Sequence, residues 1–534
     1  MRKFSTFFLL VLFMSSAVTA RASEVFDPGS TVTSPDEYVF IVGWSNPFTH
    51  STLSVQPPAV SEIGARGDWL YCTSTKDPAC DFASAKWGQD QRGIIGMSVL
   101  PYCATSTSEN CIENLEISYQ GKAYAPAKHL RMLNSGLVQQ PDPSLNYLGG
   151  ASTSIWDDSG IEGALGRSYQ TNVVYSVNYD PQLKKFSINN IAFGITPFRE
   201  VTGSYRAPSI DPNKPANSRV EWGTDRKTIW EENGRAGIAT DFPVDARYRI
   251  TARVSNQITG WYKARLQDPQ VSINKFSALN NRVTIEGKPV SVPSFAYKKS
   301  KRDFTPLENK WWQNNGQSNN TTPAGADQQD IFEYLDYFRP LVKDTVAGFN
   351  SLWTVNSTNW GNDNKCLMDT SRVVGIVSTN AMGFNGNSPK YENGTLNYQV
   401  GGMHYLPDGK SLVEGTYDLL LRSDAARCLY GFSNAPIQAS ISVTGDQIQR
   451  TAVTSMVEKD GWIKLSAYGF NFSSPNISVK FSQASAVSKE ATQVPSSGAK
   501  SSVLTKRTIS CTKGKVIRKV VGLNPKCPAG FKKR

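Results

Sequence analysis

Eight cysteines are the residues whose type and spacing most directly predict a chemistry, the formation of disulfide bonds. Their number is even and they fall into four sequence neighbourhoods, which suggests four bridges in an oxidising compartment. No spacing matches C-x-x-C and no histidine lies near a pair, so we predict no zinc site. The first four cysteines could equally pair crosswise. The expected neighbours are Cys72 with Cys80, Cys103 with Cys111, Cys366 with Cys428, and Cys511 with Cys527.

The common patterns of nucleophile and base are missing from the sequence. His50, His129 and His404 each stand alone, and none belongs to an H-x-x-x-H or H-x-H pattern. Ser272 and Lys275 match S-x-x-K, but in a strand-like context and without a K-T-G motif. There is no G-x-S-x-G elbow and no Gly-rich phosphate loop. We therefore predict no catalytic residue, no metal ligand and no cofactor.

Glycoside hydrolysis is the most credible enzymatic alternative, because it needs only two carboxylates beside aromatic sugar platforms. Two segments place acids next to tryptophans, and a third, Trp311–Asn315, could bind a glycan without hydrolysis if its tryptophans are exposed. Otherwise these tryptophans pack in the core or on a neighbouring domain. The two acidic segments contain Trp156, Asp157, Asp158 and Glu162, and Trp230, Glu231 and Glu232.

The net charge of +12 is concentrated near the C-terminus. Eleven bases and no acid lie in residues 491–534, and three more bases lie in the first 22 residues; the remaining 43 bases face 45 acids, so residues 23–490 have a net charge of −2. The basic end suggests an anionic surface as partner, although a charge run is often only a solvated end. The expected surface-binding residues are Lys513, Lys515, Arg518, Lys519, Lys526, Lys532, Lys533 and Arg534.

Residues 1–22 have the pattern of a secretory signal peptide. Arg2 and Lys3 precede an apolar run from Phe7 to Met14, and small residues at Ala20 and Ala22 follow. The apolar run is much shorter than the ~20 residues that span a bilayer, which favours cleavage over an uncleaved anchor. We expect an extracellular or cell-envelope-associated protein.

The remaining chain predicts a mainly β fold. Residues 23–305 alternate apolar and polar side chains over short runs, for example at 173–179 and 248–254, so we predict one or two β-rich domains. Residues 306–329 are rich in Asn, Gln and Gly, which is typical of a polar linker or loop.

Residues 330–484 predict one amphipathic helix followed by a β-sandwich. Apolar residues recur at helical spacing from Ile331 to Val346, with a kink or restart at Pro340. Period-two runs then return, so we predict an immunoglobulin-like sandwich and, with the preceding region, two or more sandwich domains in all. The four runs are at 417–421, 437–443, 463–467 and 477–481.

The last two segments are expected to be a tether and a small stapled unit. Residues 485–507 are rich in Ser, Ala, Lys and Thr, as flexible linkers are. Residues 508–534 predict a basic hairpin in which 509–511 pairs with 516–521, stabilised by a Cys511–Cys527 bridge worth about 3 kcal/mol. A tail that served only to keep the protein soluble would not need such a bridge. The bridge therefore favours a segment that retains the protein at a surface.

Three stretches resemble a module of large secreted or surface proteins of actinobacteria: KDTVAGFNSLWTV at 343–355, LRSDAARCLYGFSNAPIQASISV at 421–443, and EKDGWIKLSAYGFNFSSPNISVKF at 458–481. The two-cysteine C-terminal segment is similar to a basic segment on exported proteins of the same bacteria, and ITGWYKARLQDPQVSI at 258–273 resembles them more weakly. The resemblance implies export and a β-rich surface protein, and it carries no activity.

These observations together predict a secreted, cell-envelope-associated protein that acts by binding or as a structural component. Its basic end would hold it at an anionic cell-wall polymer or lipid surface, while its body binds a glycan or protein. We expect no specific nucleic-acid partner, because Phe531 is the only aromatic residue in the basic segment that could stack on a base. The rival hypothesis is a carbohydrate-binding protein or glycoside hydrolase that acts on extracellular glycans.

Overall fold

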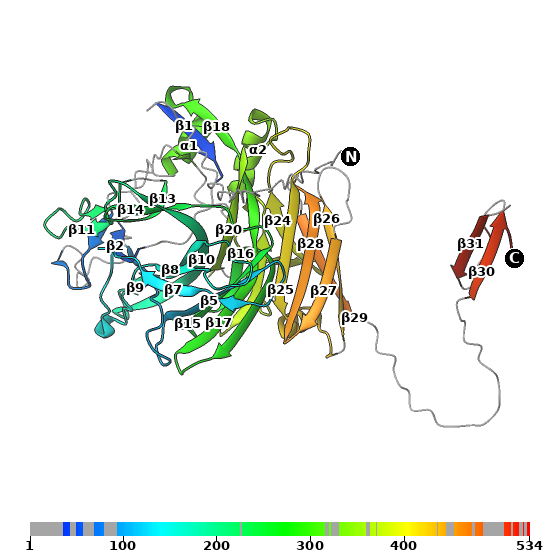
Figure 1. Cartoon of the computed structure of the whole chain (residues 1–534), viewed down its shortest axis with the longest axis horizontal. Coiled ribbons are helices and arrows are strands. Elements are labelled where there is room, and N and C mark those ends of the chain that lie inside the picture. The colour runs from blue at the N-terminus through cyan, green and yellow to red at the C-terminus, as the bar shows by residue number, and fades with distance from the viewer. Residues whose placement is uncertain are drawn as a thin grey trace, which may run out of the picture. The chain divides into compact units, whose positions relative to one another are not determined.

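The computed structural model describes most of the chain (Figure 1). The described residues are 36–42, 50–56, 69–78, 93–224, 227–314, 320–321, 330–358, 364–369, 371–434, 436–444, 453–472, 476–483, 507–513, 516–522, 527 and 531–533. The expected signal peptide and nearly all of the expected 485–507 linker lie outside them. Among the described residues, no helix is long and apolar enough to span a bilayer.

The described chain is mainly β, as the sequence predicts. Up to residue 300 the strands are β1 Glu37–Ile41, β2 Thr52–Gln56, β3 Leu70–Cys72, β4 Gly93–Val99, β5 Cys111–Tyr119, β6 Ala125–Pro126, β7 Lys128–Met132, β8 Ser154–Asp157, β9 Ser168–Asp180, β10 Lys185–Thr202, β11 Ser209–Ile210, β12 Val220–Glu221, β13 Thr228–Glu232, β14 Arg235–Ala239, β15 Ala246–Ser255, β16 Gly260–Lys275, β17 Asn280–Ser294 and β18 Ala296–Ser300.

Among the described residues after residue 300, three α-helices lie between further strands. The helices are α1 Pro306–Asn314, α2 Ile331–Leu341 and α3 Ser423–Tyr430. The strands are β19 Asn320–Thr321, β20 Gly348–Thr358, β21 Val373–Thr379, β22 Gly383–Phe384, β23 Lys390–Glu392, β24 Thr395–Gly401, β25 Glu414–Arg422, β26 Ile437–Thr444, β27 Val453–Lys459, β28 Trp462–Asn471, β29 Asn476–Gln483, β30 Arg507–Lys513, β31 Val516–Gly522 and β32 Lys532–Lys533.

Helix α2 confirms the predicted amphipathic helix, and the other two helices were not predicted. Ile331, Tyr334, Leu335 and Phe338 of α2 are fully buried, and the helix ends one residue after Pro340. Helix α1 occupies the start of the segment expected to be a polar linker, because Trp311 and Trp312 supply an apolar side for it. These tryptophans are only 2% and 6% exposed, so the interpretation of this segment as an exposed glycan-binding patch is wrong.

Strand pairing joins the two regions that we expected on either side of residues 306–329. Strand β20 pairs antiparallel with both β10 and β16, and β21 pairs parallel with β16. Strand β25 pairs with β21 and β28, and β27 pairs with β28. Residues 1–484 form one compact unit and residues 485–534 a second. Hydrogen bonds between strands therefore link both expected regions within the first unit.

Strands β16, β21 and β25 separate two hydrophobic cores. On β16, Trp261 belongs to the core around α2, whereas its neighbour Tyr262 belongs to the core of the N-terminal strands. Strand β25 divides in the same way, with Leu419 in the first core and Leu420 in the second. All seven residues of β21 are buried, because apolar side chains cover both of its faces. We call β16, β21, β25 and β28 the shared sheet.

A second sheet packs on the α2 side of the shared sheet. Its strands β22, β24, β29 and β26 lie in this order and β23 pairs with β24. Its inward residues, such as Tyr398, Val479 and Phe481, belong to the same core as Leu419 and Leu465 of the shared sheet. Two sheets thus enclose this core. The predicted runs at 417–421, 437–443, 463–467 and 477–481 are confirmed as β25, β26, β28 and β29.

Two disulfides have both cysteines within the described residues, and both join predicted neighbours. Cys103 pairs with Cys111, and Cys366 pairs with Cys428. The latter links the segment before β21 to helix α3. In the chain-entropy model, a bridge that closes a loop of this length stabilises by about 4 kcal/mol.

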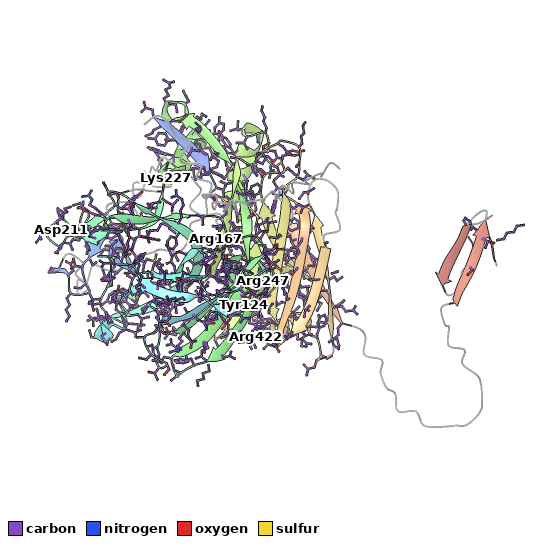
Figure 2. The ribbon with its side chains drawn as sticks, viewed as in Figure 1. Tyr124, Arg167, Asp211, Lys227, Arg247 and Arg422 are labelled. Carbon is purple, nitrogen blue, oxygen red and sulfur yellow. A yellow bond between two sulfur atoms is a disulfide. The ribbon has the colours of Figure 1, made fainter. Side chains whose placement is uncertain are left out.

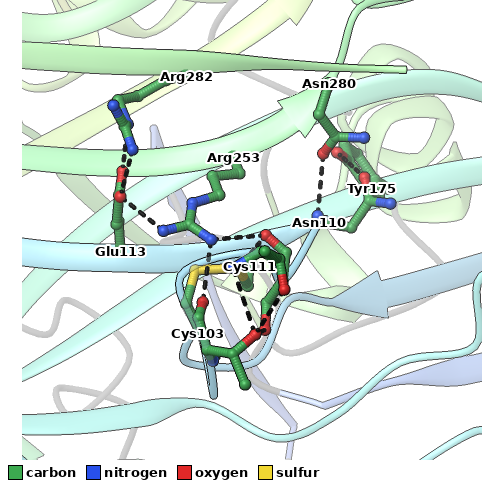
Figure 3. Close-up of a disulfide and its surroundings, with 11 residues drawn as sticks. Cys103, Asn110, Cys111, Glu113, Tyr175, Arg253, Asn280 and Arg282 are labelled. Carbon is green, nitrogen blue, oxygen red and sulfur yellow. Dashed lines mark hydrogen bonds and ion pairs between the residues drawn. A yellow bond between two sulfur atoms is a disulfide. The ribbon is translucent and has the colours of Figure 1, made fainter. Parts of the chain in front are cut away.

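Arg253 fixes the short loop that the Cys103–Cys111 bridge closes (Figure 3). Its Nη1 atom donates to the carbonyl oxygens of Thr105 and Ser108 at 3.0 and 2.8 Å, and its Nη2 atom donates to Glu113 at 2.7 Å. Burial acts to raise the pKa of Glu113, but hydrogen bonds from Arg282 and Arg253 outweigh it and keep this pKa below its usual range. The loop is therefore held by a bridge at its base and a cation at its centre.

We predict that Arg253→Met lowers the free energy of unfolding by about 1–3 kcal/mol, because it removes a buried cation that pairs with Glu113 and binds two carbonyls. The control is Arg282→Met, which removes the other, half-exposed partner of Glu113 and should cost about 1 kcal/mol or less. Urea denaturation and amide exchange in residues 103–111 measure both effects. Equal losses in the two variants would contradict the central role of Arg253.

Candidate functional site

The C-terminal unit contains the basic residues that the sequence assigned to surface binding. Strands β30 and β31 form an antiparallel hairpin in which Ile509 lies opposite Val520 and Cys511 opposite Arg518. Strand β32 adds to the other edge of β30, with Lys533 opposite Cys511. The predicted hairpin is thus present and is extended to three strands. Lys513, Arg518, Lys519, Lys532 and Lys533 lie in these strands, whereas Lys515, Lys526 and Arg534 lie outside the described residues.

The remaining predicted cysteines are only partly described. Cys72, at the end of β3, and Cys527 are both disulfide-bonded. Cys80 lies outside the described residues, and Cys511 is described only as a residue of β30. The pairing of Cys511 with Cys527 and that of Cys72 with Cys80 therefore stay predictions.

All three histidines lie in polar or aromatic contacts that the sequence did not indicate, and the Nδ1 atom of His50 lies 3.3 Å from the Ser135 hydroxyl. His129 stacks on Tyr102 with ring centroids 4.0 Å apart. His404 donates its backbone N–H to Asp344 at 2.9 Å, and its Nδ1 atom contacts the other oxygen of the same carboxylate. Asp344 also lies 3.5 Å from Arg339, so this carboxylate fastens the chain after α2 to the segment around His404.

The carboxylates that a glycosidase would need are occupied by structural hydrogen bonds. Asp158 is fully buried and accepts from the Tyr119 hydroxyl at 2.6 Å and from the backbone N–H of Arg167 at 2.8 Å. Glu231 accepts from the backbone N–H and hydroxyl of Thr224, both at 2.7 Å. Glu232 binds Arg131 at 2.6 Å. These acids hold loops in place, and their geometry does not favour the hydrolase alternative.

The two residues of the S-x-x-K match are ordinary strand residues. Ser272 and Lys275 lie on strand β16 and are both exposed. Residues three apart on a strand point to opposite faces, so this lysine cannot activate this serine. Within the described residues, no group of three or more His, Cys, Asp or Glu side chains is arranged to hold a metal ion.

A charged cluster that the sequence did not predict lies where the shared sheet meets the N-terminal strands. Asp268 on strand β16 is its centre and contacts Arg247 of β15 and Lys464 of β28, while Glu286 of β17 binds Arg247. Arg247 donates to Asp268 at 2.6 Å and to Glu286 at 3.2 Å. The Lys464 ammonium contacts the second oxygen of Asp268. With Asp418 of β25, we call these residues the bulge cluster.

A β-bulge brings Asp268 into this position. The pairing of β16 with β17 shifts register between Gln267 and Gln270, and Asp268 has a left-handed backbone with φ 56°. A non-glycine residue in this region of φ is strained, and bulges re-aim side chains. The bulge breaks the alternation of β16 at Asp268 and Pro269, which lets the Asp268 side chain, 40% exposed, reach both Arg247 and Lys464.

Asp418 is the buried acid of the cluster. Its side chain is 0% exposed and accepts hydrogen bonds from the Tyr468 hydroxyl at 2.8 Å, the Ser466 hydroxyl at 2.5 Å and the backbone N–H of Asp268 at 3.2 Å. Burial raises the pKa of Asp418 to about 7, although the bonds from Ser466 and Tyr468 act to lower it. Asp418 therefore holds a proton to higher pH than an ordinary aspartate.

Polar and aromatic side chains extend the cluster along the outer face of β15. Arg249 donates to Glu286 at 3.0 Å, and its guanidinium lies 3.9 Å from the ring centroid of Tyr124. Arg247 also donates to the Tyr124 hydroxyl at 3.3 Å (Figure 2). Burial raises the pKa of Tyr124 to about 12, so this hydroxyl stays protonated at neutral pH. The arrangement combines fixed cations, a shared carboxylate and a buried acid with a raised pKa.

One sequence signal pointed to this cluster and was missed. Asp418 lies inside the run Tyr417-Asp418-Leu419-Leu420-Leu421, where a carboxylate interrupts apolar residues. A charged residue in such a run is buried with its partners or protonated. Nothing in the sequence shows that Asp268 and Lys464 meet, because they belong to strands that pair with different neighbours.

We predict that the Asp418→Asn variant gains stability relative to the wild type as pH rises from about 4 to about 8. In this window the folded protein keeps a proton on Asp418 that the unfolded chain has lost, so the wild-type free energy of unfolding falls with pH, by up to about 4 kcal/mol. The asparagine side chain of the variant does not titrate. Urea denaturation of both proteins at the two pH values measures the difference, in which all other titrating groups cancel.

The control for this experiment is Asp460→Asn. Asp460 is exposed in the turn between β27 and β28 and has a left-handed backbone that asparagine also adopts. If the difference between Asp418→Asn and the wild type is the same at both pH values, then Asp418 does not titrate in this window.

Comparisons with known proteins identify no relative, since no protein-family model, curated protein or solved structure matches the chain. The evidence for a function therefore lies in the residues and their geometry.

Proposed function

We propose that this protein is a secreted, cell-envelope-associated binding or structural protein that is retained at an anionic surface by its basic C-terminal unit. The observation that carries the proposal is the separation of charge between two units. Residues 485–534 form a unit of their own, and residues 491–534 within it contain eleven bases and no acid. The larger unit contains nearly equal numbers of acids and bases.

Electrostatic attraction to a polyanion supports this assignment. Each base near a negatively charged surface contributes up to about 1 kcal/mol, and this contribution falls as salt shortens the Debye length. Lys532 is exposed, and the strands β30, β31 and β32 place five of the expected surface-binding residues on a small sheet. Several bases on one unit bind together, so a modest contribution from each is enough to retain the protein.

The disulfides and the β architecture support an extracellular location. Bridges such as Cys103–Cys111 and Cys366–Cys428 persist in oxidising compartments. The two sheets around the α2 core are consistent with an immunoglobulin-like sandwich, an architecture common among surface proteins. The sandwich type is part of the proposal.

The charge network of the larger unit supports a binding or structural role without turnover. In the bulge cluster and around Arg253, cations and carboxylates bind one another on the outer face of β5, β15 and β17. Such a network stabilises the surface of a sheet, and its charged side chains are paired with one another. The proposal therefore assigns no catalytic residue, cofactor or metal to the protein.

We predict that a chain truncated after Gly498 is released into the medium, because it loses all eleven bases that follow residue 490, of which Lys500 is the first. Fractionation between wall, membrane and medium measures the effect. A second variant keeps the unit and replaces Lys513, Lys515, Arg518 and Lys519 by Gln, which tests charge without removing the strands. Its matched control replaces four exposed lysines of the larger unit, Lys76, Lys184, Lys410 and Lys480, by Gln.

The expected order of cell-bound protein is wild type and control first, then the C-terminal Gln variant, then the truncated chain. Raising the salt concentration should release the wild type as well. Purified wall polymer and anionic lipid vesicles, offered separately, identify which surface is bound. If the truncated chain stays on cells as the wild type does, the retention proposal is wrong.

A further inference from the structure

Lys464 and Asp268 form an ion pair between two strands that are not hydrogen-bonded neighbours. Lys464 comes from β28 and Asp268 from the bulge in β16, and their charged atoms are in direct contact. Strands β16 and β28 do not pair with each other. The Lys464 side chain is only 20% exposed, so its amine is held against the carboxylate.

A buried acid lies beside this pair. Asp418 lies directly opposite Ser466 in the pairing of β25 with β28, and Ser466 is two residues from Lys464 on the same face of β28. Asp418 and Lys464 are therefore diagonal neighbours on that face. On its other side, Asp418 accepts the backbone N–H of Asp268 at 3.2 Å. One buried carboxyl thus lies beside both residues of the ion pair.

Arg247 occupies the second oxygen of Asp268. Its Nη1 atom donates to Asp268 Oδ2 at 2.6 Å, while Lys464 contacts Oδ1. A guanidinium on one carboxylate oxygen stabilises negative charge that develops there when a nucleophile attacks the carbon. The amine, the carbonyl carbon, an acid and an oxyanion-stabilising cation are all in place.

We propose that Lys464 and Asp268 are joined by an intramolecular isopeptide bond that the folded protein forms itself, with Asp418 as the proton carrier. The inference is independent of the proposed retention at an anionic surface. It concerns a single covalent modification of the larger unit and involves no cofactor.

The reaction is a condensation that releases one water molecule. A proton passes from the Lys464 ammonium to Asp268 Oδ1, which gives a neutral amine and a neutral acid. The amine nitrogen attacks Cγ of Asp268, and negative charge develops on Oδ2 beside Arg247. Asp418 gives its proton to the departing hydroxyl and takes one proton from the nitrogen. The C–Oδ1 bond breaks, one water molecule leaves, the C–N bond is complete, and Asp418 is protonated again.

A second lysine–carboxylate contact in the same protein provides a comparison. Lys122 and Glu162 are also in direct contact, but their side chains are 46% and 74% exposed. Both are solvated, and no buried acid lies among their described contacts. The Lys122–Glu162 pair should therefore remain an ordinary ion pair, although its charged atoms are also in direct contact.

The test is the mass of the intact wild-type protein after its disulfides are reduced and alkylated. The proposal predicts a mass lower than that of the unlinked chain by one water molecule. Protease digestion should then yield a branched peptide that contains both Lys464 and Asp268, and no branched peptide with Lys122 and Glu162. If the intact mass equals that of the unlinked chain, or if the lost water maps to another site, the proposal is overturned.

Three variants separate the roles of the residues. Lys464→Met should abolish the branched peptide, whereas Lys122→Met should leave it unchanged. Asp418→Asn keeps the two reacting groups and removes the proton carrier, so the bond should form at least about 100-fold more slowly. Amide exchange of β25 and β28 shows whether this variant has folded. A folded Asp418→Asn protein that links as fast as the wild type would overturn the role of Asp418.

Discussion

The fold of the larger unit depends on one constraint, the burial of both faces of the shared sheet. Strands β16, β21 and β25 have apolar residues on each side, and each side completes a different core. Neighbouring residues of one strand, such as Tyr262 and Trp261, therefore stabilise opposite halves of the unit. A shift in the register of β21 would remove Val374 from one core and Ile376 from the other at the same time. The two cores cannot be separated without breaking this sheet.

The shared sheet also determines where polar chemistry lies. Its face toward the N-terminal strands is apolar at Leu420 and Ile376 and becomes polar at Asp418 and Ser466. The bulge at Asp268 closes this polar end, because it turns a carboxylate back over the sheet. The charges there are partly shielded from water, and this strengthens the interactions among Arg247, Asp268 and Lys464. A single irregularity in one strand thus creates the most chemically distinctive place in the unit.

Sequence periodicity predicted the strands well and their arrangement poorly. The alternation at 417–421 and 477–481 indicated β25 and β29, and the spacing of Ile331 to Phe338 indicated α2. Helix α1 was missed because Asn and Gln surround Trp311 and Trp312, so tertiary burial outweighed a polar composition. The bulge cluster could not be predicted, since Asp268, Asp418 and Lys464 meet only through strand pairings that join distant segments. The one signal in the sequence was Asp418 itself, because a carboxylate within an apolar run indicates a buried acid.

The parallel pairing of β16 with β21 has a consequence for how the chain folds as it emerges from a ribosome. The N-terminal core includes Ile376 of β21 and Leu420 of β25 beside Tyr262 of β16, and these two residues come more than a hundred positions after Tyr262. Until β20 and β21 arrive, residues 260–265 of β16 lack the strands that pair with them. Strands β1 to β18 therefore stay incompletely folded until the later strands are synthesised. During this time, binding by a chaperone or rapid synthesis of the later strands would protect them from aggregation.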